Sequence, residues 1–351
     1  RARNLFVLAS LKEIESRTGE QDWTGAGRML EELGRRFPGD SEAPDYFLRA
    51  FRSYRTGGDM EAATKVGMLF LDDFPRRKEG VEIAGAVGAT LVERGEPGKA
   101  ADLYASVAER LPKSPEAPDL LFLAARLSVE SGDPGDAAMR FSSYRAKYAN
   151  PQWKSAYATI SIGLLAWERG DVKTAVRELE EGIRRMDAGV EKDAPRELFE
   201  IGGRGIIVLG EHWAEQFRKV TLVDPLEKSL AMKERFFRRA LAVFEKAKEE
   251  SPTEVAIQAS QMSGDLFVDF GKSILDAQRP KGLKGEERER FEEALSERAR
   301  GFFGKALDWY VGALDRLEAE KGPADLAVPI RERIESALVL LSGTTVVRGV
   351  R

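Results

Sequence analysis

The chain has 351 residues, a formal net charge of −4, one histidine and no cysteine. The lack of cysteine excludes disulfides, thiolate metal sites and cysteine nucleophiles, and the slightly acidic, interleaved charge argues against a general nucleic-acid binder. No apolar run approaches the roughly 20 residues that a membrane span requires. The chain begins at Arg1 rather than at a methionine, so we expect it to be a trimmed or processed piece.

A glycine followed by an acid, with an alanine five positions after the glycine, recurs four times along the first half of the chain. The copies are Gly58-Asp59…Ala63, Gly95-Glu96…Ala100, Gly132-Asp133…Ala137 and Gly170-Asp171…Ala175. They recur about every 37 residues, and a set of prolines keeps nearly the same step. Self-similarity at such a period predicts a solenoid of stacked repeats, with function on an extended surface.

Each repeat is predicted to contain two helices, because apolar residues recur at helical spacing on both sides of the glycine. We expect the glycine to adopt the left-handed conformation after the first helix. The acid favours the start of the second helix, and the alanine is small because the two helices cross closely there. Residues 1–40 predict a degenerate first repeat, held in register by Ala26, Leu30, Leu33 and Pro38.

After residue 189 the repeat step is lost and longer helices are predicted. Asp224-Pro225-Leu226-Glu227 and Ser251-Pro252-Thr253-Glu254 each match an N-cap, a proline at the first helical position and a capping-box glutamate. The predicted helices cover 225–250, 252–277, 286 to 320 and part of 324–342, where Pro329 starts or kinks the last one. The predicted domains are a solenoid at 1–189, an irregular long-helix extension at 190–343 and a tail at 344–351.

The repeat pattern resembles the tetratricopeptide repeat family. The family's small residue, Gly-Asp, Ala, aromatic and Pro are matched by Ala125, Gly132-Asp133, Ala137, Phe141 and Pro151, and again by Gly88, Gly95-Glu96, Ala100, Tyr104 and Pro112. The resemblance implies an all-α, right-handed α-solenoid of tetratricopeptide-like helix pairs with longer C-terminal helices. The inter-repeat turns and the C-terminal half are similar to bacterial, including deltaproteobacterial, envelope proteins, which implies a periplasmic or outer-membrane-associated location.

The sequence shows no catalytic constellation, and we expect no catalytic residue, metal site or cofactor. Gly271-Lys272-Ser273 ends like a phosphate-binding loop, but Leu266 stands where that loop needs its first glycine. The cluster Gly202-Gly203-Arg204-Gly205 lacks a dinucleotide-binding spacing and is predicted either to let helices approach closely or to mark a kink. His212, beside Trp213, is expected to be a packed or half-exposed residue.

In tetratricopeptide proteins the first helix of each repeat lines a concave groove, and the resemblance places four residues of each repeat there. They are Asp45, Leu48, Arg52 and Arg55; Glu82, Gly85, Ala89 and Val92; Asp119, Phe122, Arg126 and Val129; and Tyr157, Ile160, Leu164 and Trp167. Arginine and aromatic residues are enriched at binding hot spots. The candidate partner-binding residues are therefore Arg52, Arg55, Phe122, Arg126, Tyr157, Ile160, Leu164 and Trp167.

Two alternatives remain open for these candidates. Ile160, Leu164 and Trp167 could instead bury against the C-terminal helices. The arginines could pair with Asp45 and Asp119 on their own surface.

The predicted function is a non-enzymatic scaffold in a bacterial envelope assembly, with a protein or peptide partner held in the groove, without nucleic acid or a membrane span. One alternative is a self-assembling structural subunit that forms homo-oligomers through the helices at 225–320. Others are a helical accessory domain to a peptidoglycan enzyme and an RNA-binding repeat, which the acidic balance disfavours.

Overall fold

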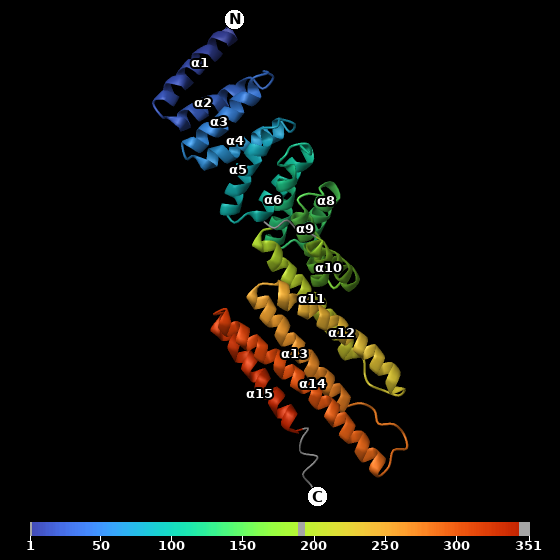
Figure 1. Cartoon of the computed structure of the whole chain (residues 1–351). Coiled ribbons are helices and arrows are strands. Elements are labelled where there is room, and N and C mark those ends of the chain that lie inside the picture. The colour runs from blue at the N-terminus through green and yellow to red at the C-terminus, as the bar shows by residue number, and fades with distance from the viewer. Residues whose placement is uncertain (1, 189–193, 344–351) are drawn as a thin grey trace. The chain divides into compact units, whose positions relative to one another are not determined.

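The computed structural model describes residues 2–188 and 194–343 (Figure 1), and all regular structure within them is helical. The predicted all-α class of tetratricopeptide-like helix pairs is confirmed. The predicted domain boundary after residue 189 and the predicted tail at 344–351 lie outside the described residues. The chain divides into two compact units, Arg1–Pro151 and Gln152–Arg351.

The first unit is a series of helices of nearly constant length. Its helices are α1 (Ala2–Gly19), α2 (Trp23–Arg36), α3 (Ala43–Thr56), α4 (Met60–Asp73), α5 (Gly80–Glu93), α6 (Pro97–Arg110), α7 (Ala117–Glu130) and α8 (Pro134–Lys147). From α2 to α8 every helix has 14 residues. Each helix packs against the next along the chain, so the constant length explains the constant sequence period.

The turn between the two helices of a repeat has the predicted conformation. Gly58, Gly95 and Gly132 have φ angles of +76°, +75° and +78°, where residues with a Cβ are strained. The carboxylates of Asp59 and Asp133 then accept hydrogen bonds from backbone N–H groups of the following helix, at 3.0 and 2.9 Å. This side-chain cap satisfies a donor that the first turn of a helix leaves unpaired.

The first repeat keeps the same turn without the glycine. Gln21 has a φ of +61°, and the carboxylate of Asp22 accepts from the backbone N–H of Gly25 at 2.9 Å. Ala26, five positions after Gln21, is fully buried. The repeat pattern therefore extends to residue 21, which a search for the glycine does not find.

Close helix crossings explain the small residues of the repeat. The alanines Ala63, Ala100 and Ala137 are buried. A Cβ on Gly88 in α5 would lie 2.3 Å from the ring of Tyr104 in α6. The Tyr104 hydroxyl donates to the carbonyl of Gly85 at 3.2 Å, so this aromatic ring fixes the distance between the two helices.

The second unit begins with the predicted fifth helix pair and continues with longer helices. They are α9 (Gln152–Glu168), α10 (Val172–Asp187), α11 (Arg196–Lys219), α12 (Leu226–Glu250), α13 (Thr253–Leu275), α14 (Glu286–Ala319), the 3-10 turn η1 (Ala324–Leu326) and α15 (Ala327–Gly343). The predicted long helices are thus present within two residues of their expected ends. Pro329 lies in the first turn of α15, where a proline starts a helix without kinking it.

The predicted capping boxes of the second unit are wrong. Helices α12 and α13 start one residue later than expected, so Pro225 and Pro252 occupy the N-cap position and no side chain caps either helix. Ser251 is instead the C-cap of α12, and its backbone N–H donates to the carbonyl of Ala247. Proline has no N–H to satisfy, so these helix starts need fewer capping bonds.

Aromatic rings packed on glycines form much of the core of the second unit. A Cβ on Gly264 in α13 would lie 2.2 Å from the ring of Tyr310 in α14, and one on Gly271 would lie 2.5 Å from Phe303. Gly271-Lys272-Ser273 is therefore part of a packed helix. The glycines of the 202–205 cluster likewise face Met186, Val255 and Ile160, which confirms their predicted role in close helix approach.

Several phenylalanine rings of the helices at 225–320 pack against one another within the chain. Phe237 of α12 packs on Phe267 and Phe270 of α13, with ring centroids 5.0 Å apart in both pairs, and Phe302 of α14 lies 4.5 Å from Phe270. These rings are consequently not available as the oligomer face considered for this segment. The Tyr310 hydroxyl also donates to Asp265 at 2.7 Å, and this carboxylate pairs with Arg333 of α15.

Candidate partner-binding groove

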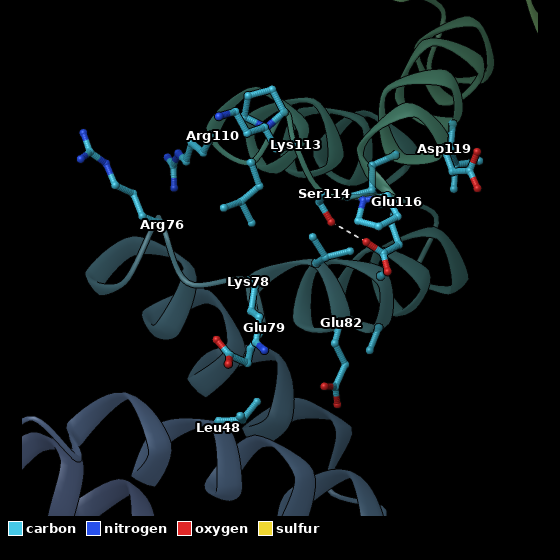
Figure 2. A pocket seen from close by; sticks show the side chains of 18 of the residues that line it. Leu48, Arg76, Lys78, Glu79, Glu82, Arg110, Lys113, Ser114, Glu116 and Asp119 are labelled. Carbon is cyan, nitrogen blue, oxygen red and sulfur yellow. Dashed lines mark hydrogen bonds between the residues drawn. The ribbon is translucent and has the colours of Figure 1, made fainter. Parts of the chain in front are cut away.

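A groove of about 1440 Å³ lies on the first unit, along the first helices of three successive repeats (Figure 2). Helices α3, α5 and α7 and the inter-repeat turns at 74–79 and 111–116 form its walls. Its lining residues are Leu48, Arg52, Arg55, Arg76, Lys78, Glu79, Val81, Glu82, Gly85, Ala86, Arg110, Leu111, Pro112, Lys113, Ser114, Pro115, Glu116, Asp119, Leu120 and Leu123. We call this surface the groove.

The repeat explains why these residues meet. The first helices of successive repeats have equal length and equivalent positions, so the same helical face is presented three times in a row. Six groove positions expected from the sequence do line it: Leu48, Arg52, Arg55, Glu82, Gly85 and Asp119. Gly85 faces open space, since no side chain or distant backbone atom lies within 4 Å of where its Cβ would be. That these residues contact a partner stays a prediction.

Arg52 is engaged within the groove. Its guanidinium donates two hydrogen bonds to the carboxylate of Glu82, at 3.0 and 2.5 Å, which joins α3 to α5. The bonds from Arg52 hold the pKa of Glu82 below its usual value. The alternative pairing of Arg52 with Asp45 is wrong, because Asp45 pairs with Arg77 at 2.8 Å.

Several other cations of the groove have no acidic partner among the residues that the structure describes. Arg76, Lys78 and Lys113 are exposed and form neither an ion pair nor a hydrogen bond there. Arg55 lies over the ring of Phe51 at 5.5 Å, and Arg110 donates to the carbonyl of Leu71 at 3.0 Å. These cations are therefore available for a ligand's negative charge.

The acids of the groove are already engaged. Glu79 pairs with Arg77 at 3.3 Å, and Glu116 accepts from the hydroxyl of Ser114, a bond drawn as the dashed line in Figure 2. That bond holds the pKa of Glu116 below its usual value. Asp119 also has an interaction partner. With Glu82 bound to Arg52, the unpaired charge of the groove is positive.

Three of the predicted partner-binding residues are buried and do not line the groove. Phe122 packs its ring on Tyr144 of α8 at 5.3 Å. Ile160 is 0% exposed, and Leu164 is buried in the same core cluster. The alternative of burial against later helices is therefore what the structure shows for Ile160 and Leu164, because α11 covers this face of α9. These three residues are not available as a binding surface.

The remaining candidates also lie outside the groove. Trp167 of α9 is half-buried and packs edge-on against the ring of His212 in α11, with centroids 6.1 Å apart. His212 is thus a packed residue, as expected, and burial lowers its pKa. Arg126 and Tyr157 are half-buried, and each has an interaction partner within the chain.

Sequence reasoning missed the cations on the inter-repeat turns. Arg76 and Lys78 follow Pro75, and Lys113 follows Pro112, at the point where one repeat joins the next. The family's groove positions count along the first helix only and leave these turns out. Basic residues directly after two successive repeat prolines are the signal that could have found them.

The described part of the chain shows neither a metal-binding cluster nor a helix suited to a membrane. Within residues 2–188 and 194–343, no group of three or more histidine, cysteine, aspartate or glutamate side chains is placed to hold a metal ion. In those same residues, no helix combines the length and the apolar character that crossing a membrane would take.

The helix pairs, the left-handed turns and the groove along the first helices define an all-α repeat protein of tetratricopeptide type. Among solved structures, the chain is similar to a TPR repeats protein from Bacteroides fragilis, with a TM-score of 0.43, 13% identity, and coverage of 76% of this chain and 99% of that one. It is also similar to a tetratricopeptide repeat protein from Parabacteroides merdae, with a TM-score of 0.33, 18% identity, and coverage of 94% and 98%.

These similarities are too weak to carry an argument about function. No protein-family model matches the sequence, and no curated protein matches it significantly. The assignment to the tetratricopeptide type of fold therefore rests on the helix pairs and turns of the chain itself.

Proposed function

We propose that the protein is a non-enzymatic scaffold that holds a segment of a partner protein in the groove. The observation that carries this proposal is the groove itself, an open surface of about 1440 Å³ built from three successive repeats. Pockets for small molecules commonly enclose only about 300–1,000 Å³ and bury most of the ligand. A larger, open groove along parallel helices suits an extended or helical polypeptide.

The lining also supports a polypeptide ligand. Leu123 of α7 is 38% exposed although it is a large apolar residue, and it lines the groove together with the half-buried Val81 and Ala86. Burying such side chains on binding is favourable by about 25 cal/mol per Å² of apolar surface. The unpaired cations of the inter-repeat turns provide direction and specificity around this apolar floor.

We also propose a cellular setting for the scaffold, a bacterial envelope assembly. Its support is the similarity of the inter-repeat turns, such as Leu111-Pro112-Lys113-Ser114-Pro115, to envelope repeat proteins. In this setting the scaffold would act in a periplasmic or outer-membrane-associated assembly. Fractionation of source cells should recover the protein with the envelope, and recovery with the cytosol alone would remove this part and leave the groove proposal intact.

Site-specific photo-crosslinking tests the groove. One photoreactive residue replaces Leu123, which lines the groove. The control replaces Met139 on α8, which is 61% exposed and lies outside the groove. We expect the Leu123 position to give a discrete protein adduct in source cells, identified by mass spectrometry, and the Met139 position to lack that adduct. The same adducts at both positions, or none at Leu123, would count against the proposal.

A further inference from the structure

We infer that the groove takes an acidic, amphipathic segment, with carboxylates on the inter-repeat turns and apolar side chains on the helices. The inference rests on the proposed function, because it names the chemistry of the partner that the same groove would hold. Three observations carry it: the balance of free charge, the position of the cations and the apolar lining.

The free charge of the groove is positive even though the chain as a whole is acidic. Six cationic and four acidic side chains line the groove, while the formal net charge of the chain is −4. The acids already have partners within the protein, as described above. Arg76, Lys78 and Lys113 have none among the described residues. Carboxylates of a ligand could therefore pair with these cations without breaking an existing ion pair.

The free cations come from two consecutive turns and not from the helix faces. Arg76 and Lys78 lie on the turn between α4 and α5, and Lys113 lies on the turn between α6 and α7. In Figure 2, Arg76 lies at the left of the pocket and Asp119 at the right, with Lys113 between them at the top and Lys78 near Glu79. Glu79 and Glu116 of the same turns already have partners, so the carboxylates of the ligand belong near the free cations of the turns.

The acids that stand among these cations favour a polypeptide over a nucleic acid. A phosphate backbone carries negative charge at every step, so part of it would face Glu82, Glu116 and Asp119. A polypeptide can place acidic residues near the free cations of the turns and apolar residues on Leu123 and Ala86. An amphipathic helix laid into a groove is a common way to combine both contacts.

The test measures binding of a fluorescent amphipathic peptide made of glutamate and leucine to the full chain. Its matched peptides replace glutamate with glutamine or with lysine at the same positions. We expect the glutamate peptide to bind at least about tenfold more tightly than either counterpart. Its affinity should fall as salt is raised, since the paired charges are exposed to solvent.

Matched protein variants locate the binding site. The groove variant Arg76→Gln/Lys78→Gln/Lys113→Gln should lose about tenfold in affinity for the glutamate peptide. The control variant Lys173→Gln/Lys281→Gln/Lys284→Gln removes the same charge from exposed positions outside the groove and should stay within about twofold of the wild type. Circular dichroism of both variants checks that the helices are intact.

Each other outcome overturns the inference. Equal binding of the glutamate and glutamine peptides, or equal affinity of both variants, would show that the turn cations do not recognise carboxylates. Binding of a single-stranded oligonucleotide or of anionic lipid vesicles, lost in the groove variant while no peptide binds, would assign the site to phosphate. If no peptide binds but the Leu123 position still crosslinks to a protein, the inference fails and the proposed function stands. If no peptide binds and that crosslink is absent as well, the inference and the proposed function both fail.

Discussion

The guanidinium of Arg52 in α3 and the carboxylate of Glu82 in α5 form a two-bonded ion pair inside the groove. The pair joins the first helices of two successive repeats. Because both side chains are about half exposed, it contributes little to stability, on the order of 0–1 kcal/mol. We expect its larger effect to be on binding, since it neutralises a cation that would otherwise face the ligand.

Replacing Glu82 with glutamine should therefore tighten binding of the glutamate-leucine peptide, by roughly fivefold. The change frees Arg52 and removes a negative charge from the groove wall. Fluorescence anisotropy measures the affinity, and urea denaturation should show a loss of less than about 1 kcal/mol. The matched control is Glu96→Gln, which breaks a surface pair with Lys99 outside the groove and should leave the affinity unchanged. Weaker binding by Glu82→Gln would contradict this role of the pair.

The side-chain caps of the repeats make different contributions to stability. Asp59→Ala removes the hydrogen bond to the backbone N–H of Ala62 and should lower the free energy of unfolding by about 1 kcal/mol. Glu96 stands at the same position of the next repeat and makes no side-chain cap bond. Glu96→Ala should therefore lower the free energy of unfolding by clearly less than Asp59→Ala does. Chemical denaturation of both variants compares them. Equal losses would mean that the cap bond of Asp59 is not what stabilises the turn.

The left-handed turn residues give a pair of opposite predictions. Gly58→Ala should destabilise the first unit by about 1–2 kcal/mol through backbone strain alone, because a Cβ there meets no other atom within 4 Å. Gln21→Gly relieves the same strain at the equivalent turn of the first repeat and should stabilise it by up to about 1 kcal/mol. Thermal unfolding of both variants shows whether each change raises or lowers the stability. A loss of stability in Gln21→Gly would contradict the shared turn geometry.

These turns also show how far the sequence predicts the fold. The step of the glycines identified the helix pairs, because the left-handed turn restricts residue type strongly at one position. The first repeat was recognised only by its apolar residues, since Gln21 occupies that position at the cost of strain while Asp22 keeps the cap. The capping box at 251–254 failed because Ser251 ends the preceding helix, which a local motif cannot reveal, and the one at 224–227 failed because Pro225 and not Asp224 holds the N-cap position of α12.

The groove was predicted less completely than the fold. The groove positions in α3 and α5, and Asp119 in α7, were found through the resemblance to tetratricopeptide proteins, in which the first helix of each repeat lines the groove. Ile160 and Leu164 were misplaced because burial under α11 depends on a helix about 40 residues away in sequence, beyond the repeat. Arg76, Lys78 and Lys113 were missed because their role depends on which acids nearby are already paired, and pairing is visible only in three dimensions.

The glycine–aromatic contacts of the second unit predict that one methyl group added at such a glycine lowers the stability strongly. Gly264→Ala places a Cβ 2.2 Å from the ring of Tyr310, which is itself held by Asp265. Overpacking of this kind should cost about 1–3 kcal/mol or more. Gly312→Ala on α14 meets no atom within 4 Å and should stabilise by about 0.5–1 kcal/mol as an ordinary helical replacement. Equal effects in urea denaturation would contradict the packing.

Buried Lys233 predicts a dependence of stability on pH. Its Nζ donates to the carbonyls of Phe217 and Val220 at the end of α11, at 3.0 and 2.7 Å, and burial lowers its pKa from 10.5 to about 8. Between these two pH values the unfolded chain binds more protons than the folded chain. The free energy of unfolding should therefore rise with pH over this window, by up to ~3 kcal/mol.

The matched variant Lys233→Met cannot titrate at this position. The difference in unfolding free energy between wild type and variant, measured by urea denaturation from pH 7 to pH 10.5, isolates the lysine from the other groups that titrate there. We expect the free energy of unfolding of the wild type to increase relative to that of the variant as the pH rises. Parallel curves would show that Lys233 keeps its ordinary pKa in the folded chain.

The most direct measurement is the affinity of the partner recovered by the Leu123 crosslink for two glycine variants. Gly85→Trp fills the open floor of the groove, and Gly312→Trp adds the same side chain at an equally open helix position outside it. Calorimetry should show at least about a tenfold loss of affinity for Gly85→Trp and a change within about twofold for Gly312→Trp. Wild-type affinity in Gly85→Trp, with its helices intact, would contradict the groove as the binding surface.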